Sequence, residues 1–519
     1  MSQIEQTDPR INEINDEIVQ IPSPVLSLID KSKDTRLLGI VYGVGMNINS
    51  IIGSGIVTSP GIIWKAVKYP RIVLLLWFVG GLVSMSGSLS YVELGVIHKV
   101  SGGETKYLQT AYPNPRNMMS YLFSLMFIFA IQPGILSAVL QSAAQYFWYT
   151  VNGANDTNQS TNGWHHSFSP FWFIKVIAVA FLFIITIYHM LSNRCANYIN
   201  QTLAAIKLAT YTIIALAGVI KLFTNWSKSQ ANWQHPIDGD ADITSYSTSI
   251  LLIMFSYNGW NSLNYSLDEF RKVEKKLVYS NSISVGITIF IYVLVNIAFI
   301  SVVPGRHVTD QNDEIIAAEF FRQLFGENDT ITRIFTALIV LSVVGTAAVE
   351  VWSGSRVIVA AAKSDFFPRY SYKLRVWNHY FDTPINALLA QFVWCTFIIL
   401  IVGSSFTITT FKLFSTFAMY SYWIFYFATG IGLLLIRKRR NQYENEKQQP
   451  FKVPLFIAGI FILAGLFILT FSFVVNSHDC PSLDSQKCRI QHLSPIFISY
   501  GFLLIVLILY YWWKVRSFG

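Results

Sequence analysis

Glycine and polar residues interrupt two of the most apolar segments of this 519-residue chain. The first segment carries Gly-Ser-Gly at 53–55, and the second carries Ser-Tyr-Asn-Gly-Trp-Asn at 256–261. Residues of this kind let a helix unwind and leave backbone N–H and C=O groups without helical partners. Unwound backbone is tolerated at membrane depth only where protein buries it or where it lines a cavity. Both stretches are therefore candidate sites, although small residues also occur where membrane helices pack closely.

The chemistry of such a site follows from the polarity of helix ends. A half-helix that begins near Gly55–Ile56 directs N–H groups and partial positive charge into the cavity, which suits a carboxylate. Half-helices that end near Ile51–Ile52 and near Phe255–Ser256 present free carbonyl groups, which suit an ammonium group. Gly53 and Gly55 have no side chain to block the approach of a ligand to the backbone. Together these features favour an α-amino acid.

The composition places the chain among polytopic membrane proteins. It is 53% hydrophobic and only 13% charged, whereas a soluble protein carries about a quarter of charged residues. The net charge of +9 is more typical of basic cytoplasmic loops than of a nucleic-acid-binding protein. A spanning helix needs about 20 mostly apolar residues. Twelve such segments are predicted, at 37–64, 72–97, 118–149, 171–191, 197–222, 245–268, 279–303, 331–362, 385–402, 408–436, 453–476 and 492–514.

The order of these segments predicts an all-α protein with an internal repeat. If helices 1–5 and 6–10 are two halves, the interruptions fall at corresponding positions, in helices 1 and 6. Paired interruptions of this kind indicate a transporter core of five plus five helices in inverted orientation. The predicted organisation is a flexible tail (1–36), a ten-helix core (37–436), a basic loop (437–452) and two additional helices (453–514).

The distribution of Lys and Arg predicts that both termini are cytoplasmic. With the N-terminus inside, the inner segments hold 24 Lys and Arg residues and the outer segments hold ten, which is the bias expected of membrane proteins. A basic cluster at 65–71 opposes this bias. The outer loops contain Cys480 and Cys488, which we predict to form a disulfide if that space is oxidising. They also contain four predicted N-glycosylation sites, at Asn155, Asn158, Asn225 and Asn328.

Several motifs resemble those of the amino acid–polyamine–organocation superfamily, and in particular its L-type amino acid transporter branch. They occur in family order and spacing over roughly residues 37–440. The stretches at 383–394 and 437–456 are most similar to fungal high-affinity methionine permeases of that branch. The motifs that carry the resemblance are IIGSGI (51–56), YVELG (91–95), SGGE (101–104), FSYNGWNSLN (255–264) and GSR (354–356).

The resemblance implies roles for the residues of both breaks. Ser54 and Gly55 would bind the substrate carboxylate. Ile51, Phe255 and Asn258 would offer carbonyl groups to the amine, and Phe255 would also be the aromatic gate above the site. Animal L-type members usually have glycine at the position of Asn258, so their substrate specificity does not transfer to this chain.

Three ionisable residues within apolar segments are candidates for coupling or gating, because charges at membrane depth are costly. Lys207 matches a lysine that fills the place of sodium in sodium-independent relatives, although it could instead extend to the interface. Glu350 could relay a proton, or it could be a structural partner of Arg356 or of nearby Ser and Thr residues. Glu93 matches a glutamate of helix 2 with a structural or gating role.

The sequence also limits the classes of substrate and of partner protein that we expect. The favoured function is transport of a neutral L-amino acid, methionine or another large one, by proton symport or exchange at the plasma membrane. A cationic amino acid or polyamine would require an acidic group in the pocket, and Asp268 and Glu269 lie too near the end of helix 6 to supply it. An amino acid sensor is a further alternative. No enzyme, cofactor or metal site is predicted, and the loop at 151–169 has no cysteine for a disulfide-linked heavy chain.

Overall fold

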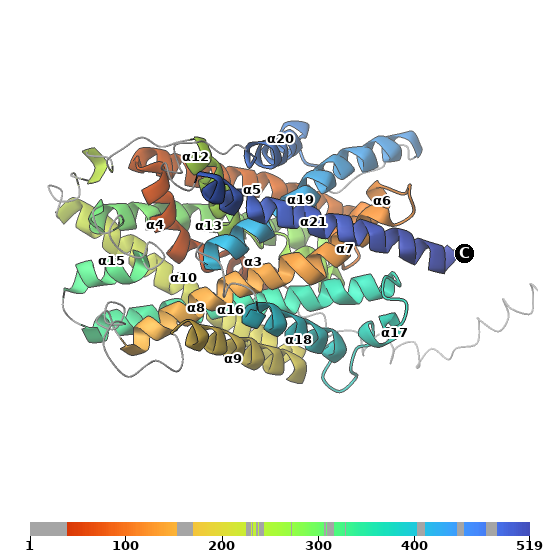
Figure 1. Ribbon diagram of the computed structural model, residues 1–519, viewed down its shortest axis with the longest axis horizontal. Helices are drawn as coiled ribbons and strands as arrows, with labels where there is room; N and C mark the ends of the chain where they lie inside the picture. Colours follow the sequence, from red (N-terminus) through yellow and green to blue (C-terminus); the bar gives the residue numbers. More distant parts are fainter. Residues whose placement is uncertain are drawn as a thin grey trace, which may run out of the picture.

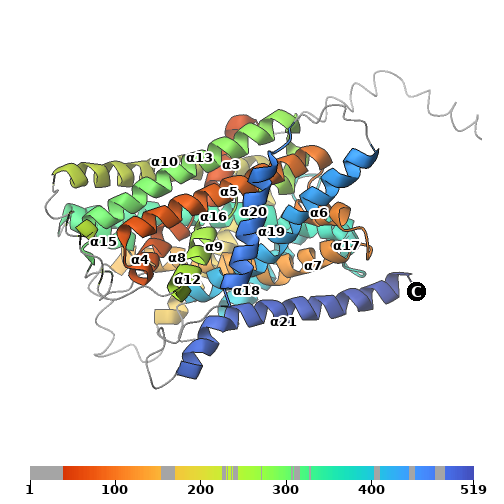
Figure 2. The same cartoon turned by 90° about the horizontal axis from the view of Figure 1, so that it is seen from above.

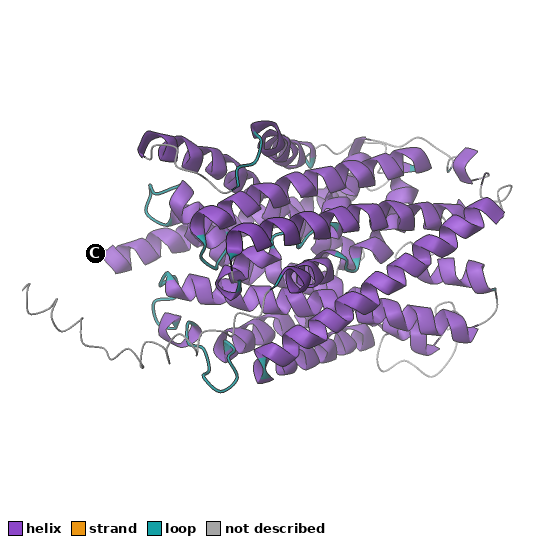
Figure 3. Cartoon of the chain, turned by 180° about the vertical axis from the view of Figure 1, so that it is seen from behind, coloured by secondary structure: helices purple, strands orange, loops and turns teal. Residues whose placement is uncertain are grey.

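In the described part of the chain, helices account for the regular structure of the computed structural model, apart from one isolated bridge between Asn378 and Thr383 (Figures 1 and 3). The structure describes residues 39–152, 170–224, 230, 232–234, 237, 243–270, 272–305, 308, 316–326, 329–401, 410–443, 451–473 and 485–518. The tail at 1–36, the four predicted glycosylation asparagines (Asn155, Asn158, Asn225 and Asn328) and the Cys480–Cys488 pair lie outside the residues whose side chains are described.

Twelve apolar segments are present in the described ranges, which confirms the prediction of a polytopic all-α membrane protein. Three are helices of 14 to 17 residues, and one consists of two helices that meet at a 40° bend. The short ones are α12 (Ile243–Ser256), α18 (Ile385–Ile401) and α20 (Leu455–Phe471), and the bent pair is α3 (Ile40–Ile51) with α4 (Gly55–Val67). The long ones are α5 (Pro70–His98), α7–η1–α8 (Met118–Asn152), α9 (Pro170–Leu191), α10 (Asn193–Thr224), α13 (Val273–Val302), α16 (Asp329–Lys363), α19 (Thr410–Tyr443) and α21 (Ser485–Phe518).

Helices that are five segments apart in sequence pack against each other. The second segment, α5, packs on the seventh, α13, and the third, α8 (Gln132–Asn152), packs on the eighth, α16. The fourth, α9, likewise packs on the ninth, α18. This is the pairing expected if the first ten segments form two equivalent halves. The interrupted segments 1 and 6 also lie together, since α4 packs on α12.

Three shorter helices outside the spans were not predicted from hydropathy. Helices α6 (Glu104–Ala111) and α17 (Ser371–Leu374) lie at one end of the bundle, which we name the α6 end (Figure 1). Helix α15 (Ile316–Phe325) lies at the other end, which we name the α15 end. Helix α21 lies along the outside of the bundle, as the view from above shows (Figure 2).

Candidate functional site

The first break lies where the Gly-Ser-Gly sequence predicts it. Helix α3 ends at Ile51 and α4 begins at Gly55. A Cβ atom on Gly55 would lie 2.4 Å from Cα of Ser256, and one on Gly53 would lie 2.9 Å from Cγ2 of Thr346. Since real Cβ atoms do not approach backbone atoms so closely, glycine at 55 is what allows the two interrupted segments to touch.

The second break is longer than the first. Helix α12 ends at Ser256, and after a turn the chain continues as the 3₁₀ helix η3 (Ser262–Glu269). Gly259 lies in that turn with φ of +101°, a conformation that L-residues rarely adopt. A Cβ atom there would lie 2.4 Å from Oγ of Ser50. The sequence therefore places glycine where the turn must have positive φ and must lie directly on the end of α3.

Lys207 donates to the buried, broken end of α3. Its side chain is 0% exposed, and Nζ lies 2.7 Å from the carbonyl oxygen of Asn49 and 2.8 Å from Oγ1 of Thr346. The Thr346 hydroxyl in turn lies 2.9 Å from the carbonyl oxygen of Ile52. Lys207 therefore does not extend to the interface, and α10 and α16 together supply the donors that the interrupted backbone requires.

Tyr292 joins the two breaks and was not identified from the sequence. Its hydroxyl oxygen lies 3.0 Å from the carbonyl oxygen of Ile51 and 2.7 Å from that of Ser256. Phe255 offers its carbonyl to the backbone N–H of Asn258 at 3.1 Å. The single Tyr292 hydroxyl hydrogen is shared between the carbonyls of Ile51 and Ser256, and the carbonyl of Phe255 already accepts a full hydrogen bond. Each of these carbonyls therefore keeps at least one lone pair for a ligand.

With respect to the described residues, the N-terminus of α4 retains unpaired N–H donors. The N–H groups of Val57 and Thr58 bond to the carbonyl of Ser54, so the N–H groups before them precede the first helical hydrogen bond. Ser54 precedes the helix without capping it, and its hydroxyl is buried with no hydrogen-bond partner among the described residues. This end of α4 can therefore bind an anion.

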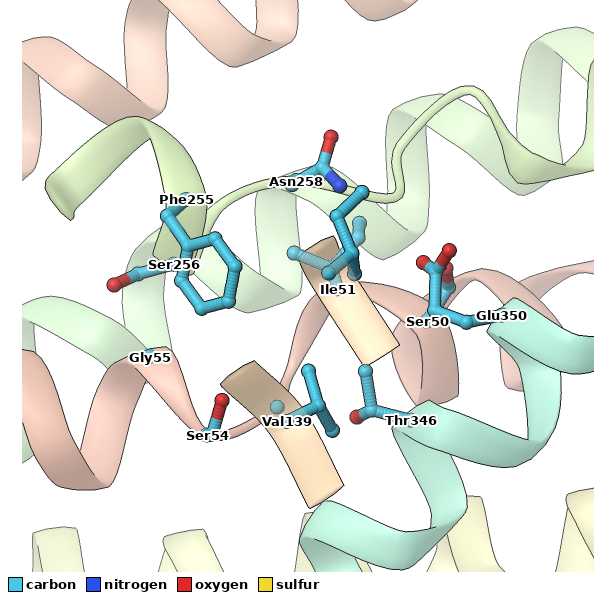
Figure 4. Close-up of a pocket in the computed structure, with 12 residues that line it drawn as sticks. Ser50, Ile51, Ser54, Gly55, Val139, Phe255, Ser256, Asn258, Thr346 and Glu350 are labelled. Atoms are coloured by element: carbon cyan, nitrogen blue, oxygen red, sulfur yellow. The ribbon is translucent and has the colours of Figure 1, made fainter. Parts of the chain in front are cut away.

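A narrow pocket opens between the two breaks (Figure 4). The ring of Phe255 packs edge-on against Phe411 with centroids 5.4 Å apart. The pocket is lined by all the residues that we predict to contribute to the substrate site at the two breaks, Ile51, Gly53, Ser54, Gly55, Phe255, Ser256 and Asn258. In Figure 4, Glu350 lies beside Ser50 on the side of the pocket away from Gly55. The lining residues are Ser50, Ile51, Gly53, Ser54, Gly55, Ile135, Val139, Phe255, Ser256, Asn258, Thr346 and Glu350.

The comparison with protein families decides what kind of protein carries this pocket. A family model described as amino acid permease matches residues 38–485, which is most of the chain. The chain belongs to the amino acid permease family.

Similar proteins agree with the resemblance drawn from the motifs. The permease is 26% identical over 476 residues to b(0,+)-type amino acid transporter 1 of Mus musculus, covering 91% of this chain and 88% of that protein. It is 24% identical over 450 residues to the high-affinity methionine permease of Saccharomyces cerevisiae, covering 85% and 74%. It is 25% identical over 440 residues to large neutral amino acids transporter small subunit 2 of Mus musculus, covering 84% and 76%. These relatives are transporters and permeases, not enzymes.

Glu350 of the permease lies in the pocket wall, a position that was not predicted from the sequence. Its side chain is 6% exposed, and Oε1 lies 3.4 Å from Oγ of Ser50. A serine is therefore a hydrogen-bond partner of Glu350, as one of the suggested structural roles requires. Arg356 is not its partner, because Nε of Arg356 donates to Oε1 of Glu269 at 2.8 Å. In the described part of the chain Glu350 forms no ion pair, so the pocket contains an acidic group without a matching cation.

Arg356 and Glu93 hold the α6 end of the permease together. Arg356 is buried against the ring of Trp352, 3.9 Å from its centroid, and its pairing with Glu269 fastens the end of η3 to α16. Glu93 is fully buried on α5 and pairs with Arg437 of α19. These buried pairs favour a structural role for Glu93, because each charge is matched by a partner.

No group of three or more His, Cys, Asp or Glu side chains suitable for a metal ion occurs among the described residues. Cys195 and Cys395 are both free thiols.

Proposed function

We propose that the permease is a secondary transporter of neutral L-amino acids, methionine or another large one, that works by alternating access without sodium. The observation that carries the proposal is the contact between the two breaks around one buried pocket. Either proton symport or exchange of amino acids drives accumulation.

The backbone and Ser54 would recognise the groups that all amino acids share. The unpaired N–H groups at the start of α4 and the free hydroxyl of Ser54 suit the carboxylate. The carbonyl groups of Ile51 and Phe255 lie across the pocket and retain a lone pair for the ammonium group. Phe255 covers the pocket on one side, in keeping with a gating role.

The remaining walls favour an uncharged side chain. Ile51, Ile135, Val139 and Phe255 contribute apolar surface to the pocket, and a few polar groups that fix orientation within an apolar wall are typical of small-molecule sites. A flexible apolar thioether suits such a wall, and a methionine permease is among the relatives.

Lys207 supports independence from sodium. Its ammonium group is fixed between the carbonyl of Asn49 and the hydroxyl of Thr346. These are oxygen ligands of the kind that hard cations prefer, and a resident positive charge there repels a metal cation.

The positive-inside bias indicates that the α6 end is cytoplasmic and that both termini are inside. The plasma membrane is the proposed location, with glycosylation of the outer loops. The loop at 151–169 contains no cysteine, so we propose that the permease functions without a disulfide-linked heavy chain.

One observation favours a second candidate, a cationic amino acid or polyamine as substrate. This alternative requires an acidic group in the pocket, and Glu350 lines it with no ion pair among the described residues. Glu350 also accepts a hydrogen bond from Ser50, and the apolar side chains in the pocket wall outnumber this single acidic one. A neutral substrate therefore remains the first proposal.

Uptake of radiolabelled L-methionine tests both candidates. In permease-deficient yeast that express the chain at the surface, we expect saturable uptake that does not change when sodium is replaced by choline. Unlabelled leucine and other large neutral amino acids should compete at least about tenfold more strongly than lysine or spermidine, since an uncompensated charge in an apolar wall costs more than 1.4 kcal/mol.

Competition by lysine that equals or exceeds that of methionine would favour the cationic substrate. Binding of labelled methionine to the purified protein without any uptake would contradict the transport proposal and favour a sensor.

A further inference from the structure

Glu104 is a second buried acid without a cation, and it lies outside the predicted binding site. It begins α6, the short helix between the spans α5 and α7, and its side chain is 0% exposed. Among the described residues it takes part in no ion pair, whereas Glu93 is matched by Arg437 and Glu269 by Arg356. A buried carboxylate without a counter-charge is costly and favours the protonated form.

A continuous set of hydrogen bonds connects this carboxyl group to the pocket. Asn261 donates from Nδ2 to Oε1 of Glu104 at 2.8 Å. The Tyr426 hydroxyl lies 3.3 Å from Oδ1 of Asn261 and 3.0 Å from Oδ1 of Asn258. Asn258 lines the pocket, so only two residues separate Glu104 from the wall of the proposed binding site.

The groups that face Glu104 are phenols rather than cations. They come from α5, from α6 itself, from η3 and from α19. Helix α7 contributes Ser124, which bonds to Thr105. Ser364, the residue after α16, accepts from Lys106 at 3.2 Å and so holds that ammonium near the end of α16. Glu350 acts on the same cluster from the pocket side, through Tyr422. The phenols are Tyr91, Tyr107, Tyr265, Tyr422 and Tyr426.

Such surroundings bring the titration of Glu104 into the physiological range. Burial raises the pKa of its carboxyl to about 7, and hydrogen bonds from its backbone and from neighbours that include Asn261 limit the increase. The carboxyl is therefore protonated below about pH 7 and ionised above it.

We propose that Glu104 binds the proton that enters with the amino acid, and that Asn261 and Tyr426 connect its protonation state to Asn258 in the pocket. This inference rests on the proposed transport function and names its driving ion. The ionised carboxylate holds the Asn261 amide by a charge-assisted hydrogen bond, which is about twice as strong as a neutral one. Protonation weakens that bond and so loosens α6 from the turn that joins α12 to η3. One proton is taken up on one side and released on the other, and no other group changes chemically.

Transport in proteoliposomes separates coupling from binding. Counterflow of labelled L-methionine at equal pH measures exchange, and accumulation driven by a pH gradient measures coupling. We expect Glu104→Gln to keep counterflow within about threefold of wild type and to lose gradient-driven accumulation by at least tenfold. Glu104→Asp, which still titrates, should recover part of it. The matched control is Glu274→Gln, the same change at a partly exposed acid that pairs with Lys99, and it should behave as wild type.

Two results would overturn the inference: gradient-driven accumulation in Glu104→Gln equal to wild type, or loss of counterflow in that variant from protein that elutes as wild type. If Glu104→Gln yields no folded protein, Tyr426→Phe tests the same connection. It should flatten the pH dependence of counterflow, and an unchanged profile would contradict the inference. Wild-type protein that exchanges methionine but ignores the gradient would contradict proton coupling alone, whereas wild-type protein with neither activity would contradict the proposed function itself.

Discussion

Gly55→Ala is expected to lower the rate of amino acid uptake by at least about tenfold. The new methyl group would lie 2.4 Å from the backbone Cα of Ser256, and backbone cannot rotate away as a flexible side chain can. Forcing extra volume into a packed interior typically costs about 1–3 kcal/mol, and about 1.4 kcal/mol corresponds to a factor of ten. The cost falls on the contact between α4 and α12, which forms one wall of the pocket.

The control for this change is Gly459→Ala in α20, where a Cβ atom meets nothing within 4 Å. Initial rates of methionine uptake should be compared at equal surface expression, together with thermal unfolding of the purified variants. Gly459→Ala should transport as wild type. Wild-type uptake by Gly55→Ala would show that the close approach of the two breaks is not required.

Lys207→Met is expected to have the second large effect. It should lower the rate of transport while leaving the stability of the fold nearly unchanged. The change removes the donor that fixes the carbonyl of Asn49 and the hydroxyl of Thr346. After the change the Thr346 hydroxyl alone would donate to the carbonyls of Asn49 and Ile52, and a hydrogen bond to a charged group contributes about 1.5–3 kcal/mol. We expect transport to fall at least tenfold, because the end of α3 that faces the pocket is no longer held.

The melting temperature of Lys207→Met is expected to stay within a few degrees of wild type, because replacing a buried charge by an apolar residue of similar volume is often neutral. Lys221→Met, the same change at a partly exposed position near the end of the same helix, serves as the control. Full transport by Lys207→Met would refute the role of this lysine.

The breaks were predictable because their cause is local. Gly-Ser-Gly at 53–55 and Gly259 within a polar stretch weaken helices wherever they occur, and the structure ends α3 and α12 at the residues where the sequence predicts it. The paired positions of these breaks in the hydropathy pattern were enough to predict which two segments meet.

Tyr292 and Thr346 were not predictable for a physical reason. Each is one of several polar residues spread along a long, mostly apolar helix, α13 or α16, and such a spread gives no signal of which polar residue meets the end of a broken helix. Their hydroxyl groups satisfy backbone carbonyls across a helix interface, a contact that depends on packing and not on local sequence.

Glu350 does not pair with Arg356, although the two residues are close in sequence. Residues three or four apart share a helix face, whereas six apart do not. Helix α16 therefore points Glu350 at Ser50 in the pocket and Arg356 at Glu269 near the α6 end. A separation of six residues therefore predicts different surroundings for the two side chains, and the structure has them in different surroundings.

The central claim is that the two breaks recognise the carboxylate and the ammonium group of an amino acid, and competition by analogues of methionine tests it most directly. Binding of labelled L-methionine to the purified permease should be displaced by unlabelled L-methionine. Methioninol, which lacks the carboxylate, and N-acetylmethionine, which lacks the charged amine, should each compete at least about a hundredfold less well, since each leaves buried polar groups of the pocket unpaired at a cost of about 3 kcal/mol. Equal competition by either analogue would contradict recognition of that group by the breaks.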